Sequence, residues 1–305
     1  MDLKNKKILV TGGAGFLGGH IVKKLLERGV PKENIFTPRS FELDLRKRAD
    51  CQKAVNDRDV VIHAAALTGN VELHKSRSAE IFYNNLIMGV ELIEAARQAG
   101  VQKFITIGSA TEYPDNIRLP FREDDLWMGP LEPIHAPYTV AKKMLLVNAQ
   151  AYRKQYGFNA VHILLTNMYG PSEHEDGGPI PALIKRIGEA RKTGETTVRI
   201  WGTGRATRDF LYVGDAVEGI CLVTEKYDKS EPINLGSGFE ISIKELAEII
   251  ARLMNFDGKL DFDPTKPEGQ PRRVLDTARA EKELNFKAIT DFEEGLKQTI
   301  KWHGY

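Results

Sequence analysis

The sequence predicts an α/β fold: a doubly wound parallel sheet with a smaller, discontinuous α/β lobe. Three observations carry this prediction. The first apolar run leads into a glycine-rich turn, and short apolar runs then alternate with longer helical patterns. After residue 168 the sequence becomes rich in the polar residues and glycines that are typical of loops. Strands that alternate with helices in this way form parallel sheets with helices on both faces.

The elements follow in order along the chain. Short apolar runs predict strands at 6–11, 33–37, 59–63, 103–108 and 160–166. Helical periodicity predicts helices at 15–28, 47–56, 78–99 and 136–156. A further helix is expected to end near Lys192, and segments 213–225 and 232–236 are expected to return to the first sheet.

The glycine-rich turn has the spacing of a dinucleotide-binding fingerprint. Gly12 would permit the tight turn, Gly15 would let the backbone approach a pyrophosphate, and Gly18 would let the helix pack on the strand. The helix N-terminus at Phe16 and Leu17 would supply hydrogen-bond donors and a partial positive charge. We therefore expect a dinucleotide-binding domain of residues 1–168 and about 207–236, and a substrate lobe of residues 169–206 and 237–305.

Three residues near the middle of the chain have the chemistry of hydride transfer. Ser109 ends an apolar run, and Tyr138 and Lys142 stand four residues apart in a helical segment, so they share one helix face. A phenol with a pKa of about 10 needs a nearby cation to favour its phenolate, and Lys142 can be that cation. Alone, such a pair also fits an ordinary helix surface; the glycine turn favours the catalytic interpretation.

Composition limits the other functions. The 305 residues include 43 basic and 42 acidic ones, a net charge of +1, so no overall field attracts nucleic acid or an anionic membrane. Cys51 and Cys221 form neither a disulfide framework nor a metal-ligand spacing, so we expect no metal. With no leader pattern and no long apolar stretch, a cytoplasmic location is expected.

These residues resemble the extended short-chain dehydrogenase/reductases that act on nucleotide sugars, which have a Rossmann-like fold. The matching motifs are Thr11–Gly18, Asp44-Leu45, His63–Ala66, Asn85, Ser109, Tyr138–Lys142, Asn167–Pro171 and Thr207–Phe210. Further motifs are most similar to GDP-L-fucose synthases, namely Gly129–Pro133, Ile180–Ile184, Ile200–Gly204 and Pro267–Asp276. The resemblance implies an NAD(P)-dependent epimerase or reductase, a nucleotide-sugar substrate and a homodimer.

The resemblance also implies roles for single residues. Tyr138 would pass a proton to or from the sugar oxygen, Ser109 would hydrogen-bond the same oxygen, and Lys142 would also hold the nicotinamide ribose. Asp44, beside Leu45, would accept a hydrogen bond from the adenine amino group, or would only cap a helix. The small residues Ala64, Ala65 and Ala66 suit a strand end under a cofactor, and equally suit packing beneath a helix.

The residues that follow the second predicted strand indicate which dinucleotide is bound. NAD enzymes usually carry an acidic residue at its end, whereas this chain has Arg39 and Ser40 there. Arg39 can pair with a 2′-phosphate and Ser40 can donate a second hydrogen bond, which favours NADP(H). NAD(H) stays possible, with Arg39 as a surface residue in a turn.

On the substrate side, the resemblance assigns a pyrophosphate clamp to Arg208 and Arg273, with help from Asn167. Solvated loop arginines are the alternative. Trp201 would pack on the nucleotide base or fill the core of the small lobe, and the sequence does not choose between these.

One departure from the fucose synthases matters. Those enzymes epimerise carbons 3 and 5 with a cysteine and a histidine, and here Thr111 and Gly178 stand at the two positions. His135, Glu173 and His174 lie in loops near the expected cleft and could substitute, although such residues are usually exposed.

Two alternative functions follow from the same residues. A UDP-hexose 4-epimerase with tightly held NAD would need only Ser109, Tyr138 and Lys142, with Thr111 as a hydrogen-bond donor to the sugar. A non-catalytic dinucleotide sensor would be free to lose those three residues, and all three are present.

Overall fold

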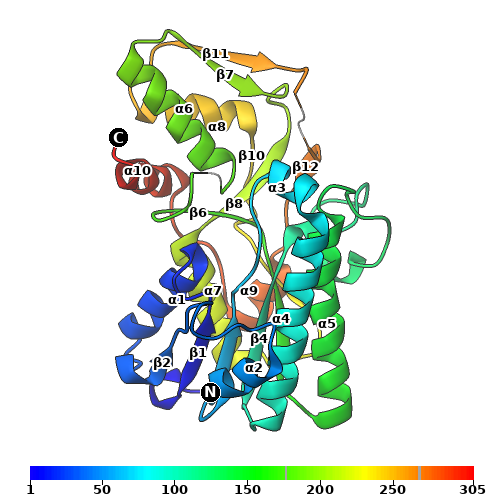
Figure 1. Ribbon diagram of the computed structural model, residues 1–305. Coiled ribbons are helices and arrows are strands. Elements are labelled where there is room, and N and C mark those ends of the chain that lie inside the picture. The colour runs from blue at the N-terminus through cyan, green and yellow to red at the C-terminus, as the bar shows by residue number, and fades with distance from the viewer. Residues whose placement is uncertain (176, 267–268) are drawn as a thin grey trace.

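A computed structural model describes residues 1–175, 177–266 and 269–305. The chain forms a large lobe built on one sheet and a small lobe that contains α6 (Pro179–Thr193), α8 (Ile243–Leu253) and α10 (Phe292–Trp302) (Figure 1). Pro267 and Glu268, from the motif at 267–276, lie outside the described residues.

The large lobe contains a six-stranded parallel sheet. Its strands are β1 (Ile8–Thr11), β2 (Ile35–Phe36), β3 (Val60–His63), β4 (Lys103–Ser109), β5 (Ala160–Leu165) and β9 (Ile233–Leu235). They lie in the order β2-β1-β3-β4-β5-β9, and every pairing is parallel. The chain reverses its direction of winding between β1 and β3, and in such sheets ligands bind at the carboxyl ends of the strands beside this switch point.

Helices cover both faces of this sheet, as predicted. One layer contains α1 (Phe16–Glu27), α7 (Val213–Lys226) and α9 (Ala278–Leu284), and the other contains α2 (Arg48–Val55), α4 (Ser78–Gln98) and α5 (Ala136–Tyr156). Alternation along β1 explains the two cores: Ile8 and Val10 pack in the first layer, whereas Leu9 packs in the second. The strands are therefore apolar on both faces.

The small lobe has its own sheets and core. Strand β8 (Thr207–Tyr212) pairs with β6 (Asn167–Tyr169), β10 (Glu240–Ser242) and β12 (Arg272–Arg273), while β7 (Thr197–Trp201) pairs with β11 (Lys259–Asp263). Apolar faces of α6 (Pro179–Thr193), α8 (Ile243–Leu253) and α10 (Phe292–Trp302) enclose a separate hydrophobic core.

The chain crosses between the lobes more than once. After β8, helix α7 returns to the first core and β9 joins the edge of the large sheet beside β5. The short helix α3 (Val71–Ser76), which the sequence analysis did not predict, lies at the junction with the small lobe (Figure 1). Short 3-10 turns are η1 (Leu3–Asn5), η2 (Lys32–Asn34), η3 (Ala110–Glu112) and η4 (Glu123–Asp125). No helix in the described residues has the length and apolar character to span a membrane.

Candidate active site

The glycine turn after β1 depends on close backbone contacts. Gly12 has φ +70°, and a Cβ there would lie 2.9 Å from the backbone of Ala65 on the loop after β3. A Cβ on Gly18 would lie 2.1 Å from the Gly12 carbonyl oxygen. The helix α1 therefore packs directly on the turn, and its first amides, which have no intrahelical acceptors, are available to an anion.

A hydrogen-bond chain ties β1 to β3 below this turn. The Thr11 hydroxyl lies 2.8 Å from Nδ1 of His63 and accepts a hydrogen bond of 3.1 Å from the Ala65 amide. Burial, with a smaller contribution from Lys142, lowers the pKa of His63 to about 3, so the ring is neutral. Asn85 holds the next part of the loop through two hydrogen bonds with the backbone of Leu67.

Ser109, Tyr138 and Lys142 come from the end of β4 and the first turns of α5. The Lys142 ammonium lies 6.0 Å from the centre of the Tyr138 ring. Ser109 Oγ accepts hydrogen bonds from the amide and the hydroxyl of Thr111, at 3.2 and 3.1 Å, which leaves its own proton available to donate. The structure thus brings the three predicted residues to one edge of the sheet.

One electrostatic expectation, on the pKa of Tyr138, was wrong. Lys142 was expected to lower the pKa of Tyr138, but burial, assisted by the Glu112 carboxylate, raises it. The physical reason is that burial removes water from around the phenolate, and the neighbouring ammonium does not outweigh this cost. Lys142 is itself 2% exposed, and burial lowers its own pKa to about 8 despite the opposing effect of Glu112. Tyr138 is therefore a neutral phenol at neutral pH, which suits it to donate a proton.

A buried acid that the sequence analysis did not consider supports Ser109 from below. Glu112 Oε1 accepts a hydrogen bond of 2.9 Å from the Ser109 amide, and Oε2 lies 3.1 Å from Nε2 of His162. The other nitrogen of His162 lies 2.7 Å from the Thr106 hydroxyl. The Ser-x-x-Glu spacing of a capping box was the available sequence signal for this contact.

The end of β2 presents the residues that were predicted to select the dinucleotide. Arg39 and Ser40 are both exposed, and the Arg39 guanidinium has no ion-pair partner within the described ranges. Asp44 is engaged by Arg46, at 2.8 Å from Nε, and this hydrogen bond lowers the Asp44 pKa to about 2. Leu45 is buried in the core beside β1.

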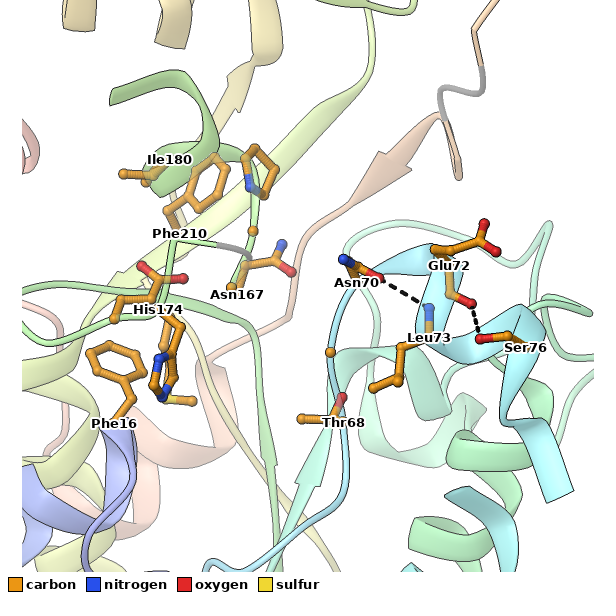
Figure 2. Close-up of a pocket in the computed structure, with 16 residues that line it drawn as sticks. Phe16, Thr68, Asn70, Glu72, Leu73, Ser76, Asn167, His174, Ile180 and Phe210 are labelled. Atoms are coloured by element: carbon orange, nitrogen blue, oxygen red, sulfur yellow. Dashed lines mark hydrogen bonds between the residues drawn. The ribbon is translucent and has the colours of Figure 1, made fainter. Parts of the chain in front are cut away.

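A pocket of about 760 Å³ lies between the lobes (Figure 2). Asn167 lines one side of it, and Asn70 and Leu73 at the start of α3 line the opposite side. The pocket also touches Phe16, the first residue of α1. Its remaining lining residues are Thr68, Gly69, Glu72, Ser76, Met168, Glu173, His174, Gly177, Gly178, Pro179, Ile180 and Phe210.

The α3 side of this pocket was missed because six residues are too few for a periodic pattern. The Asn70 side chain caps the helix by accepting a hydrogen bond of 3.0 Å from the Leu73 amide, and such a cap was the available sequence signal. On its other side, α3 places the His74 ring edge-on to Tyr138, with ring centres 5.6 Å apart. Helix α3 therefore borders the pocket on one side and the Tyr138 side chain on the other.

His74 and His135 form a pair beside Tyr138. Their ring centres lie 4.7 Å apart, and Nδ1 of His135 lies 2.6 Å from the Glu132 carboxylate. Burial first and His135 second lower the pKa of His74, so its ring is neutral at neutral pH. His135 is half-buried and His174 is exposed, whereas Glu173 is buried, contrary to the expectation of exposed loop residues.

The two predicted clamp arginines are adjacent. Arg208 and Arg273 are register partners on the paired strands β8 and β12. Burial, with Arg208 as a second cause, lowers the pKa of Arg273 to about 10. Asn167 stands on β6, which also pairs with β8, and its amide donates a hydrogen bond to the Asp209 carbonyl at 3.3 Å. Two neighbouring cations of this kind are suited to a polyanion.

Trp201 does not fill the core of the small lobe, so that alternative was wrong. The residue is 54% exposed on β7, where alternate side chains point to solvent. Arg186 and Lys266 stand over its ring at 5.4 and 6.0 Å from the ring centre. In the described part of the chain, no cluster of three or more His, Cys, Asp or Glu side chains could hold a metal ion.

Comparison with known proteins identifies the family. The model of the NAD-dependent epimerase/dehydratase family matches residues 8–236. The chain belongs to this family. It is 37% identical to the GDP-L-fucose synthase of Sinorhizobium fredii, over 98% of this chain and 96% of that protein. It is 35% identical to the probable GDP-L-fucose synthase 1 of rice, Oryza sativa subsp. japonica, over 98% and 92% of the two chains.

A solved structure extends this likeness to the fold. The GDP-mannoheptose C4 reductase of Campylobacter jejuni, solved with NADP bound, superimposes with a TM-score of 0.90 at 26% identity, covering 99% of both chains. The predicted fold class and the predicted membership of a nucleotide-sugar epimerase and reductase family are confirmed.

Proposed function

We propose that the protein is a nucleotide-sugar reductase that uses NADP(H) to reduce the ketone of a GDP-4-keto-6-deoxyhexose. One observation carries the proposal: Ser109 ends β4 and Tyr138 lies in the first turn of α5, at the edge of the sheet that also carries the glycine turn. Helix α3 lines the pocket between the lobes and contacts the Tyr138 ring through His74. The likeness to GDP-L-fucose synthases and to an NADP-bound C4 reductase supports the choice of sugar class and cofactor.

The residues fit a bound dinucleotide. The amides at the start of α1 and the bare Gly12 and Gly15 would hold its pyrophosphate. Arg39 and Ser40 would hold the 2′-phosphate, and Lys142 would hold the nicotinamide ribose. The cofactor, when bound, would supply the hydride that reduces carbon 4 of the sugar.

The chain's own groups would handle the proton. Ser109 would donate its free hydroxyl proton to the ketone oxygen and fix its position. Tyr138, which is neutral because its pKa is raised, would transfer its proton to that oxygen as negative charge develops there. Lys142 would stabilise the phenolate that remains, because its ammonium lies on the same helix face. Arg208 and Arg273 would neutralise the diphosphate of the substrate.

A UDP-hexose 4-epimerase is the second candidate, and the hydroxyl contact between Thr111 and Ser109 favours it. The Thr111 hydroxyl would have to turn away from Ser109 to donate its one proton to the sugar of a substrate that is oxidised and reduced again on the same enzyme. This function would require NAD(H) to stay bound between turnovers.

The deciding experiment compares two substrates with the purified protein. GDP-4-keto-6-deoxymannose with NADPH should give stoichiometric loss of NADPH absorbance, and Tyr138→Phe should lower turnover by about 100-fold or more while it still binds NADPH. UDP-glucose with NAD is the parallel sample. Its conversion to UDP-galactose without net cofactor consumption would overturn the reductase proposal.

A further inference from the structure

The Glu173 carboxyl group is buried in the wall of the pocket between the lobes. The residue is 5% exposed, and its Oε2 atom is buried without a hydrogen-bond partner. Its amide donates a hydrogen bond of 3.3 Å to the Gly170 carbonyl, which fixes the turn that carries the side chain. A buried polar atom without a partner costs about 1 to 3 kcal/mol in stability, and a ligand that forms a hydrogen bond with this oxygen would remove that cost.

Two glycines make room for this carboxyl. A Cβ on Gly177 would lie 2.8 Å from Oε1 of Glu173, and a Cβ on Gly178 would lie 3.7 Å from the same atom. The first distance is too short for a side chain at position 177, and the second is an ordinary van der Waals contact, so the carboxyl lies directly beside position 178. Gly178 itself offers no acid or base, and Glu173 places a carboxylic acid next to it.

The surroundings keep the carboxyl neutral. The pocket lining on this side includes the apolar side chains Phe16, Ile180 and Phe210 (Figure 2). No cation in the described residues pairs with Glu173. Burial raises its pKa to about 8, opposed only by a hydrogen bond with the Gly170 backbone. A group with a pKa near the working pH can both accept and return a proton.

Other titratable groups face the same region. Glu72 of α3 and His174 line the pocket, and His20 of α1 contacts the Pro171 carbonyl at 2.8 Å and the Ser172 hydroxyl at 3.2 Å. These groups belong to three different elements around the carboxyl. A pH dependence assigned to Glu173 must therefore disappear when Glu173 itself is replaced.

The pocket reaches the edge that carries the proposed hydroxyl donors. Asn167, on the pocket wall, follows two residues after Leu165, which is the register partner of Ser109. On the other wall, Leu73 lines the pocket and the adjacent His74 contacts the Tyr138 ring. A sugar whose ketone meets Ser109 and Tyr138 would extend its ring into the pocket that contains Glu173.

We propose that Glu173 is an acid–base residue that exchanges the hydrogen on a carbon next to the sugar ketone, an inference that rests on the proposed function. The Glu173 carboxylate takes the proton, the C–H electron pair becomes the carbon–carbon double bond of an enolate, and the negative charge moves to the ketone oxygen. Ser109 and Tyr138 hydrogen-bond that oxygen. Return of a proton from Glu173 restores the ketone.

The test measures hydrogen exchange apart from reduction. The protein is incubated with GDP-4-keto-6-deoxymannose and NADP⁺ in D₂O, so that no hydride is available, and deuterium at carbons 3 and 5 is followed by NMR and mass spectrometry. We expect enzyme-dependent deuteration whose rate rises with pH and levels off above about 8, because the carboxylate is the active form. Glu173→Gln should lower the rate by about 100-fold or more and remove this pH dependence.

Matched variants separate chemistry from folding. Glu175→Gln alters an exposed glutamate two residues away, which pairs with Lys185 at 2.6 Å. This variant should incorporate deuterium into the sugar at the wild-type rate. Glu173→Asp keeps a carboxyl group and should retain part of the exchange. NADPH binding and thermal unfolding report whether each variant folds.

The outcomes distinguish the two proposals. Wild-type protein that consumes NADPH but incorporates no deuterium would overturn the role of Glu173 and leave the reductase standing. Exchange that persists in folded Glu173→Gln would overturn it as well. Exchange that is lost in Glu173→Gln, in a protein that does not consume NADPH, would support Glu173 and overturn the reductase.

Discussion

Replacing Glu112 by alanine should destabilise the protein more than most surface substitutions would. Glu112 and His162 are both fully buried, and the carboxylate is a partner of the Ser109 amide as well as of the His162 ring. Alanine removes this partner from the part-buried Ser109 amide and from the buried Nε2 of His162, at about 1 to 3 kcal/mol each, so the expected loss is about 2 to 6 kcal/mol. For a chain of this length, each kcal/mol corresponds to roughly 1.6 °C in Tm, which gives a decrease of about 3 to 10 °C.

Thermal unfolding of three variants tests this reasoning. Glu112→Gln can still accept from the Ser109 amide and donate to His162 if the ring changes tautomer, so it should lose about 1 kcal/mol or less in stability. Glu175→Ala breaks only a surface ion pair and should stay within about 1 kcal/mol of the wild type. A Glu112→Ala protein whose Tm equals that of the Glu175→Ala control would refute this prediction.

The remaining predictions concern binding, pH and assembly. Arg39→Ala should weaken NADPH binding by roughly 10- to 100-fold, the value of one charged hydrogen bond, and leave NADH binding unchanged in a fluorescence titration. The kcat/KM should fall as pH rises through about 8, because Lys142 then loses its charge. In Lys142→Arg, whose guanidinium stays protonated, this fall in kcat/KM should occur at higher pH, even if the highest kcat/KM of the variant is lower than that of the wild type. Arg273→Gln should raise KM for the nucleotide sugar far more than it changes NADPH affinity, as steady-state kinetics would show. The expected homodimer should pair through α4 and α5, so Tyr83→Glu, on the exposed side of α4, should shift the sedimentation of a dimer towards that of a monomer.

The sequence was most informative where a single local rule determines the structure. Helix α5 begins at Ala136 and ends at Tyr156, as its periodicity predicted, with Pro137 in its first turn and Gly157 in the left-handed conformation after it. The glycine turn was equally predictable, because the Gly12 and Gly18 positions admit no side chain. These signals act over a few neighbouring residues and need no tertiary partner.

The sequence was least informative where burial decides the chemistry. Tyr138 and Lys142 were predicted to lie on one helix face, but the direction of the Tyr138 pKa shift depends on burial and on Glu112, which comes from another element. The burial of Glu173 likewise depends on a pocket formed by both lobes. Neither property follows from spacing along the chain.

The distribution of acids around the site relates these findings to one another. Glu112 lies beneath Ser109 with both oxygens engaged, so it positions the backbone and raises the pKa of Tyr138 without being free to exchange protons with a ligand. Glu173 lies in the wall of the pocket with one oxygen unpartnered, and it is the carboxyl group to which the proposed proton exchange is assigned. Two buried carboxyl groups in one enzyme thus differ in role because their hydrogen-bond partners differ. Substituting glutamine at each position separates the roles, since the substitution should cost little stability at Glu112 and should lower the rate of proton exchange by about 100-fold or more at Glu173.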